Sequence, residues 1–387
     1  MKKIVVQNEG VTDIDYVLYI PDKMRRNSKI LLSLNPEDAL DELESNARIS
    51  TILENATMPV MIPIIKKWLD NEGNIIEMPN ISGLSKKEAT EKVDEYKIEL
   101  SKYTEMYPYT LLNSKINTPK IFEKYIEVIK DAYSRLWKAN ILDKTDDFSV
   151  DIEGYSAQGV KAQRLAMLIP EYVRSVFVGG AISSIPIVSE NEDLPYPIGF
   201  SNISEIVGEE KAKTIVSNYK KVFQNLFVSE NELEFDGRFT INGIPVSQHD
   251  KSPDVVEIVD KQVELFGEDI NDRVNSVIKL NRENSANIQN YKIYKNTNHH
   301  SPNKDIVRDM VRVIEGLDEG EKIILEAGAD RINTEFQEKR KAKFLEKRKV
   351  DIETLVRNIQ RDSLNQSDIN KTENNLKNRE RKNPVKD

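Results

Sequence analysis

The sequence predicts an α/β protein in which helices flank a mostly parallel sheet. Short apolar runs of strand length recur along the chain, and segments with helical periodicity lie between them. Strands that alternate with helices are typical of a parallel sheet. The chain has 387 residues, of which 39% are hydrophobic. It can therefore bury a sizeable core, in one large domain or two ordinary ones.

The predicted strands are apolar runs bounded by polar or turn-forming residues. The first two, 14–20 and 29–34, are separated by a polar turn, and the run at 173–178 ends at a pair of glycines. The remaining predicted strands are 58–65, 148–152, 244–247 and 291–294.

Three segments are predicted as helices between or after these strands. In the longest, 120–138, apolar residues follow one helical stripe that includes Ile121 and Leu136. Residues 160–168 follow the strand at 148–152, and residues 304–314 close the body of the chain.

Two long segments, 70–118 and 186–240, do not follow this alternation. Insertions of this length on such a sheet usually form caps or lids over the ligand crevice. The predicted organisation is therefore a body of residues 1–332 that includes both insertions, followed by a separate tail of residues 333–387.

Charge is distributed unevenly along the chain. The net charge is −9, but residues 336–387 carry 15 basic and 9 acidic side chains, which leaves −15 on the remainder. We predict a charged helix over roughly 333–361 and a disordered end beyond it. The alternative is a segment that docks a protein partner or an acidic surface.

Composition excludes several classes of function. Without cysteine the chain forms neither disulfides nor a cysteine zinc site. It contains no HExxH sequence and no glycine-rich phosphate-binding motif, so we expect no metal and no cofactor. The net negative charge, and a basic tail without interleaved aromatic residues, argue against nucleic-acid binding.

The apolar runs are too short for a signal peptide or a membrane helix. Only Ile4, Val5 and Val6 are apolar near the start before polar residues resume. We therefore expect a cytoplasmic protein with no membrane span.

The turn between the strand at 148–152 and the next helix carries the clearest chemical signal. Gly154, Tyr155 and Ser156 open the G-x-S-x-G pattern of a nucleophile elbow. Glycine is needed before the serine because a side chain there would collide with the neighbouring strand. The serine is raised at the positive end of a helix, where the N–H of Ala157 can stabilise an oxyanion.

One position departs from this pattern. Gln158 stands at the second glycine position, and glycine follows one place later at Gly159. We expect the long side chain of Gln158 to point out of the turn, which weakens the pattern without abolishing it.

A nucleophilic serine needs a histidine base and an acid that orients it, in the chain order Ser, Asp or Glu, His. His299 and His300 follow the last predicted strand. Asp250 follows the strand before it, and Asp254 is the alternative acid. We favour Asp250 because it lies nearer the strand end and is held more rigidly. His249 precedes the acid and is expected to line the mouth of the site.

Residues 120–181 resemble the bacterial esterase-type serine hydrolases of the α/β-hydrolase superfamily. The matching features are Asp131-Ala132, the turn Gly154–Gly159, Pro170–Val173 and the pair Gly179-Gly180. The resemblance covers roughly 14–316. It implies the α/β-hydrolase fold for the body of the chain, with cap or lid insertions.

The same resemblance assigns His299 as the base and His300 as its neighbour, because His299 ends a stretch similar to the G-x-G-H loop of the family. Asp250 likewise ends a stretch similar to its G-x-x-D strand end. The glycines of both loops are replaced in this sequence.

The family takes its second oxyanion donor from a loop after an early strand, often His-Gly-Gly-like. The corresponding stretch here is 33–37, which lacks the His-Gly pair. Pro36 has no N–H to donate, so the N–H of Asn35 or Glu37 is expected to serve.

The sequence therefore predicts a carboxylesterase- or lipase-like serine hydrolase that acts on a small-molecule ester through an acyl-enzyme. Ser156 is the nucleophile, His299 the base and Asp250 the orienting acid. Two alternatives stay open. One is a peptidase or amidase on the same triad. The other is a non-catalytic binding protein of the same fold, which Gln158, the missing His-Gly loop and the basic tail favour.

Overall fold

The computed structural model of the chain has one compact unit over Met1–Ala327. The predicted tail of residues 333–387 and the predicted strand at 244–247 lie outside the described residues. The structure describes residues 1–7, 14–34, 46–65, 67–69, 75–77, 83–85, 87–89, 91–92, 118–155, 157–180, 185–189, 194–196, 199–229, 263–267, 270–295 and 304–325.

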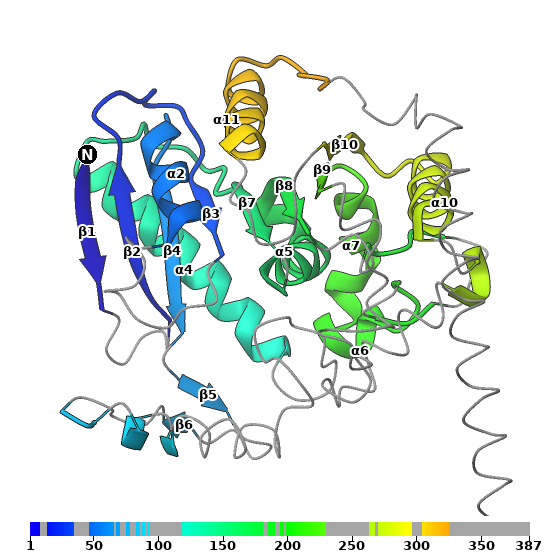
Figure 1. Cartoon of the computed structure of the whole chain (residues 1–387), viewed down its shortest axis with the longest axis horizontal. Coiled ribbons are helices and arrows are strands. Elements are labelled where there is room, and N and C mark those ends of the chain that lie inside the picture. Colours follow the sequence, from blue (N-terminus) through cyan, green and yellow to red (C-terminus); the bar gives the residue numbers. More distant parts are fainter. Residues whose placement is uncertain are drawn as a thin grey trace, which may run out of the picture. The chain divides into compact units, whose positions relative to one another are not determined.

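An eight-stranded sheet forms the centre of the unit, in the order β1-β2-β4-β3-β7-β8-β9-β10 (Figure 1). β2 is antiparallel to both of its neighbours. From β4 to β10 every adjacent pair is parallel, which confirms the predicted fold class. The strands are β1 (Lys2–Val6), β2 (Ile14–Ile20), β3 (Leu31–Ser33), β4 (Val60–Ile65), β7 (Val150–Tyr155), β8 (Val173–Gly179), β9 (Phe223–Ser229) and β10 (Ile288–Tyr294).

Helices cover both faces of this sheet. On one face, α2 (Ala47–Asn55) and α11 (Lys304–Asp318) pack into an apolar core with strand residues such as Val17, Leu31 and Phe177. On the other face, α4 (Thr118–Lys138) meets β2, where Tyr16 donates a hydrogen bond to Asp131 at 2.5 Å. α5 (Ala157–Leu168) lies on this second face, against β7 and β8.

Shorter elements complete the unit. The antiparallel pair β5 (Lys67–Leu69) and β6 (Ile75–Glu77) forms a separate small sheet. The other helices named here are η1 (Pro170–Tyr172), α6 (Ile203–Val207), α7 (Glu209–Tyr219) and α10 (Ile270–Glu283). Among the described residues, no helix is both long and apolar enough to cross a membrane.

The structure shortens the predicted catalytic turn. The strand predicted at 148–152 continues to Tyr155, and the helix predicted from residue 160 begins at Ala157. The strand looks shorter in the sequence because Glu153 and Gly154 interrupt its apolar run, although Glu153 is buried.

β9 was not predicted, because its residues fall within the segment 186–240 that the sequence assigns to an insertion. In the structure β9 is an inner strand of the sheet. Its apolar run is interrupted by Gln224 and Asn225, which are nevertheless buried. Asn290 of β10 donates a hydrogen bond to Asn225 at 2.7 Å, so the polar side chain of Asn225 has a partner on the neighbouring strand.

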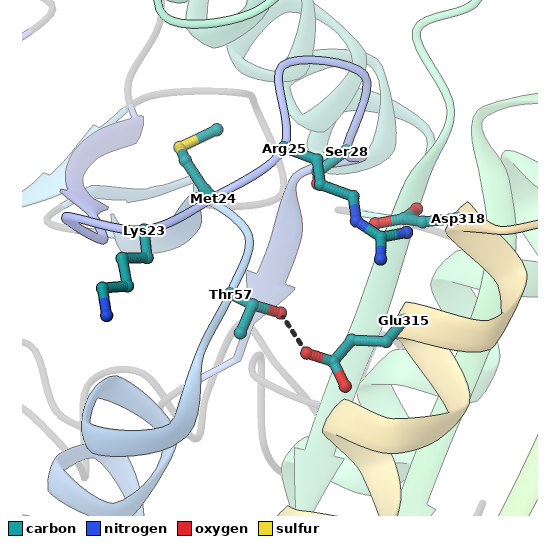
Figure 2. A pocket seen from close by; sticks show the side chains of 7 residues that line it. All are labelled: Lys23, Met24, Arg25, Ser28, Thr57, Glu315 and Asp318. Atoms are coloured by element: carbon teal, nitrogen blue, oxygen red, sulfur yellow. Dashed lines mark hydrogen bonds between the residues drawn. The ribbon is translucent and has the colours of Figure 1, made fainter.

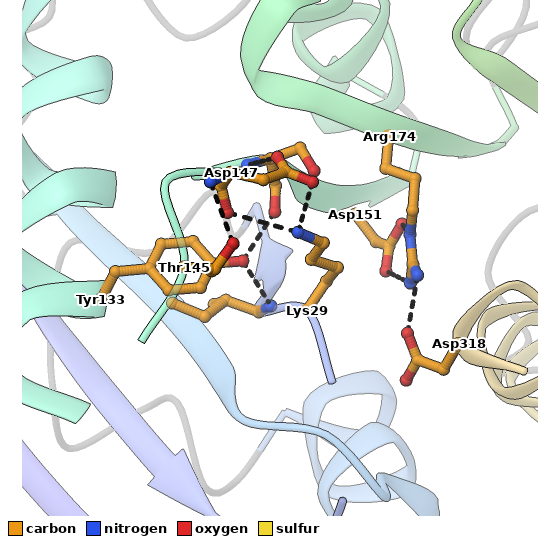
Figure 3. A network of polar contacts seen from close by, with 9 residues as sticks. Lys29, Tyr133, Thr145, Asp147, Asp151, Arg174 and Asp318 are labelled. Atoms are coloured by element: carbon orange, nitrogen blue, oxygen red, sulfur yellow. Dashed lines mark hydrogen bonds and ion pairs between the residues drawn. The ribbon is translucent and has the colours of Figure 1, made fainter. Parts of the chain in front are cut away.

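A network of polar side chains closes the amino-terminal edge of the parallel strands (Figure 3). Arg174 of β8 donates to both carboxylate oxygens of Asp151 on β7, at 2.9 and 2.5 Å. It also donates to Asp318 at the end of α11, at 2.6 Å. The side chains of Asp151 and Asp318 are 0% and 4% exposed. Burial raises the pKa of Asp318, and the Arg174 guanidinium opposes that rise.

The same figure shows how the segment before β7 is held. Lys29 contacts the carboxylate of Asp147 at 2.6 Å. The Tyr133 hydroxyl, from α4, donates to the backbone oxygen of Ser149 at 2.6 Å. These contacts connect the entry of β7 to the segment before β3 and to α4.

Replacing Arg174 with methionine should lower the free energy of unfolding by roughly 3–5 kcal/mol, because two buried carboxylates lose their cation. The matched control is Arg308→Met, which breaks an ion pair with Asp305 whose side chains are 64% and 71% exposed. That loss should not exceed about 1 kcal/mol. Urea unfolding followed by circular dichroism measures both, and equal losses would contradict the role given to Arg174.

Candidate active site

β7 passes into α5 through a single residue. The strand ends at Tyr155 and the helix begins at Ala157, so Ser156 is the one residue of the sequence between them. Ser156 itself lies outside the described residues, but both of its neighbours are described. The first N–H groups of a helix have no partner within the helix and favour a negative charge.

Two glycines make this turn possible. A Cβ built on Gly154 would lie 2.1 Å from the backbone oxygen of Gln158 and 2.8 Å from the backbone nitrogen of Gly159. A Cβ built on Gly179 of β8 would lie 2.4 Å from the ring of Tyr155. Glycine is therefore required at Gly154, as the sequence predicts. A side chain at position 154 would collide with the first turn of α5 and not, as expected from the sequence, with the neighbouring strand.

Gln158 is buried, with 2% of its surface exposed. Its amide nitrogen and oxygen have no hydrogen-bond partner in the described part of the chain. The close contact with Gly154 is made by the backbone of Gln158. A side chain at position 158 is therefore compatible with the tight turn.

The predicted catalytic residues follow strands that end at one edge of the sheet. β3, β7, β9 and β10 belong to the parallel part of the sheet, so their carboxyl ends lie along the same edge, where ligands bind in open α/β sheets. The segments that leave these ends contain Asn35 and Glu37 after β3, Ser156 after β7, Asp250 and Asp254 after β9, and His299 and His300 after β10.

None of these seven side chains is among the described residues, and neither is His249. Of the predicted site, the structure describes the backbone of Ala157 at the start of α5. The triad of Ser156, His299 and Asp250 therefore stays a prediction, supported by the strands from which its segments leave.

Sequence reasoning missed a buried ion pair beside the turn. Glu153, which directly precedes Gly154, is paired with Arg48 of α2 and accepts a hydrogen bond from Ser33 of β3. The signal that could have found it is an acidic residue next to an elbow glycine and within an apolar strand. Its partners could not be identified from the local sequence.

A second missed cluster joins the two elements that flank His299 and His300. At the end of β10, the Tyr294 hydroxyl donates to Asp309 of α11 at 2.7 Å. Lys292 contacts the same carboxylate at 2.7 Å. The strand before the histidine segment and the helix after it are thereby held together.

The structure also has a cavity of about 250 Å³ near the opposite, amino-terminal edge (Figure 2). Several of its polar groups already have partners. Glu315 accepts a hydrogen bond from Thr57 at 2.9 Å, Asp318 pairs with Arg174, and Arg25 pairs with Glu319. The lining residues are Lys23, Met24, Arg25, Ser28, Thr57, Glu315 and Asp318. None of them is a predicted catalytic residue.

The described residues contain no group of three or more His, Cys, Asp or Glu side chains placed to hold a metal ion.

Comparisons with known proteins give structural likeness only. No protein-family model matches the chain, and no curated protein matches it. Poly(aspartic acid) hydrolase-1 from Sphingomonas sp. KT-1 is 12% identical, with a TM-score of 0.45 over 81% of this chain and 98% of that chain. A poly(3-hydroxybutyrate) depolymerase from Bordetella parapertussis is 12% identical, with a TM-score of 0.44 over 83% and 91%. A siderophore hydrolase from Aspergillus nidulans is 9% identical, with a TM-score of 0.41 over 82% and 94%.

The fold itself follows from the observed topology. A mostly parallel eight-stranded sheet has helices on both faces, and a buried strand that ends at Tyr155 is followed by a helix that begins at Ala157. The chain has the α/β-hydrolase fold.

Proposed function

We propose that the protein is a serine hydrolase that cleaves carboxylic esters through an acyl-enzyme on Ser156. The observation that carries the proposal is the turn from β7 into α5, where the backbone at Gly154 lies too close to Gln158 for a side chain. Such a turn is what a nucleophile elbow requires. The segments that carry the proposed acid and base leave neighbouring strands at the same edge.

In the proposed reaction, Ser156 Oγ attacks the ester carbonyl while His299 accepts the hydroxyl proton. The tetrahedral intermediate breaks its bond to the alcohol, and His299 returns the proton to the leaving alkoxide. Water then attacks the acyl-enzyme with the same base, which releases the acid and restores the serine. Asp250 accepts a hydrogen bond from the imidazole and stabilises its cationic form.

Two backbone N–H groups would stabilise the oxyanion. Ala157 begins α5, so its N–H lies at the positive end of a helix. The second donor, from Asn35 or Glu37, would come from the segment after β3. This segment leaves the sheet beside the turn, because Ser33 of β3 is paired in register with Glu153 of β7.

Gln158 favours a second candidate, a non-catalytic binding protein of the same fold. Its buried amide stands where the elbow pattern has glycine, and no described residue satisfies it. Turnover separates this candidate from a hydrolase. Parallel assays of short acyl esters and aminoacyl amides separate an esterase from a peptidase or amidase on the same triad.

Ser156→Ala should abolish labelling by a fluorophosphonate probe, because the probe reacts with an activated serine hydroxyl. The control is Ser217→Ala, which removes an exposed hydroxyl on α7 and should leave labelling at the wild-type level. Gel fluorescence of the labelled proteins measures both. Equal labelling of wild type and Ser156→Ala, or none in either, would exclude Ser156 as the nucleophile.

His299→Ala should lower the kcat for a short acyl ester by roughly 10⁴–10⁶-fold, because the serine loses its base. His300→Ala is the matched control and should stay within about tenfold of wild type. Steady-state hydrolysis of p-nitrophenyl acetate measures both variants. A large loss in His300→Ala alone would move the base to His300.

Asp250→Asn should lower kcat by about 10⁴-fold, because the imidazole loses the group that fixes its tautomer. Asp254→Asn changes the alternative acid in the same way and should have a small effect. The same ester assay compares them, and the opposite ranking would assign the acid to Asp254.

A further inference from the structure

A buried cluster lies next to the proposed nucleophile turn, outside the groups assigned to the reaction. The side chain of Glu153 is 6% exposed and that of Arg48 is 18% exposed. One carboxylate oxygen of Glu153 accepts a hydrogen bond from Ser33 Oγ, and the other is paired with Arg48 Nη1. Burial raises the pKa of Glu153, while the Arg48 charge and the Ser33 hydroxyl oppose that rise.

Arg48 also contacts Leu34, which follows β3, and Asn46, which precedes α2. Its Nη2 donates to the backbone oxygen of Leu34 at 2.8 Å. Its backbone N–H donates to Oδ1 of Asn46, the cap of α2, at 3.0 Å. The N–H of Leu34 in turn donates to the backbone oxygen of Glu153 at 3.0 Å. The Arg48 side chain thus ties Leu34 to Glu153, on the strand that precedes the turn, and its backbone helps to cap α2.

Helix stability does not explain an arginine at this position. Arg48 lies in the first turn of α2, where the helix macrodipole disfavours a cation. Burying the pair also costs desolvation, so apolar side chains of similar size would be about as stabilising. What the guanidinium adds is geometry, because its planar fork holds Glu153 and Leu34 at the same time.

We propose that Ser33, Glu153 and Arg48 form a positioning clasp that holds Leu34 and the start of α2 beside the carboxyl end of β7, and so positions the backbone that leads to the proposed second oxyanion donor. This inference rests on the proposed hydrolase function. In this proposal the three residues act through the backbone at Leu34 rather than through a contact with the substrate. The oxyanion develops only in the transition state, so loosening the clasp should lower kcat and leave KM nearly unchanged.

The test is the double variant Glu153→Leu/Arg48→Met, which removes both charges and keeps apolar bulk. Hydrolysis of p-nitrophenyl acetate should show kcat lowered by about 10²–10³-fold, the cost of losing one oxyanion donor. KM should stay within about threefold, and the urea midpoint should stay near that of wild type, because no buried charge is left unpaired.

The milder variant Arg48→Lys provides a second test if the double variant does not fold. Lysine retains a charge for Glu153 but has one nitrogen, so it cannot hold Leu34 in the same fork. We expect kcat about tenfold below wild type with KM unchanged.

The control is Arg174→Met, which breaks the cluster at the opposite edge of the sheet. It should lower stability and leave the kcat of the folded protein within about threefold of the wild-type value.

Two outcomes with the clasp variants would overturn the proposal. If Arg48→Lys and a folded double variant both keep kcat within about threefold of wild type, the clasp has no positioning role. The same conclusion follows if kcat falls only in proportion to the folded fraction.

The variant Ser156→Ala separates a failure of the clasp from a failure of the proposed hydrolase function. Activity that survives Ser156→Ala overturns both the hydrolase assignment and the clasp. An inactive Ser156→Ala with a fully active double variant overturns the clasp alone.

Discussion

The close approach of Gly154 to the first turn of α5 is the constraint on which the proposed site depends. Successive side chains of a strand point to opposite faces, and position 154 points toward α5. A Cβ there would lie 2.1 Å from the oxygen of Gln158, so any other residue would push the helix away from the strand. Gly179 plays the complementary part on β8, where it makes room for the ring of Tyr155.

The opposite face of β7 carries two acidic residues, Asp151 and Glu153, two positions apart and therefore on the same side of the sheet. Each is buried against an arginine, Asp151 with Arg174 and Glu153 with Arg48. One cluster closes the amino-terminal edge of the sheet and the other lies at the carboxyl edge, beside the turn. One face of β7 thus packs against α5, and the other face carries the two buried charge pairs.

The features predicted from the sequence are those encoded locally. β2 has an unbroken apolar run over Tyr16–Ile20, β8 ends at a pair of glycines, and the residues of the serine turn are adjacent in the sequence. β9 escaped prediction because Asn225 finds its partner 65 residues away, on β10. Glu153 escaped because Arg48 and Ser33 lie 105 and 120 residues away. Local patterns cannot show that a polar residue is satisfied by a distant one.

Each of the two helices on the charged face of β7 carries, at one terminus, a charge that its own macrodipole disfavours. α2 has Arg48 and no acidic residue in its first turn, and α11 ends at Asp318 with no basic residue in its last turn. The macrodipole disfavours each charge by up to about 1 kcal/mol, so the partners in the sheet must determine them. A helix shifted along the sheet would leave buried charges unpaired, which is far more costly than the pair is stabilising. We infer that the two clusters select one docking position for each helix, and that α2 is thereby held at the edge where the proposed chemistry occurs.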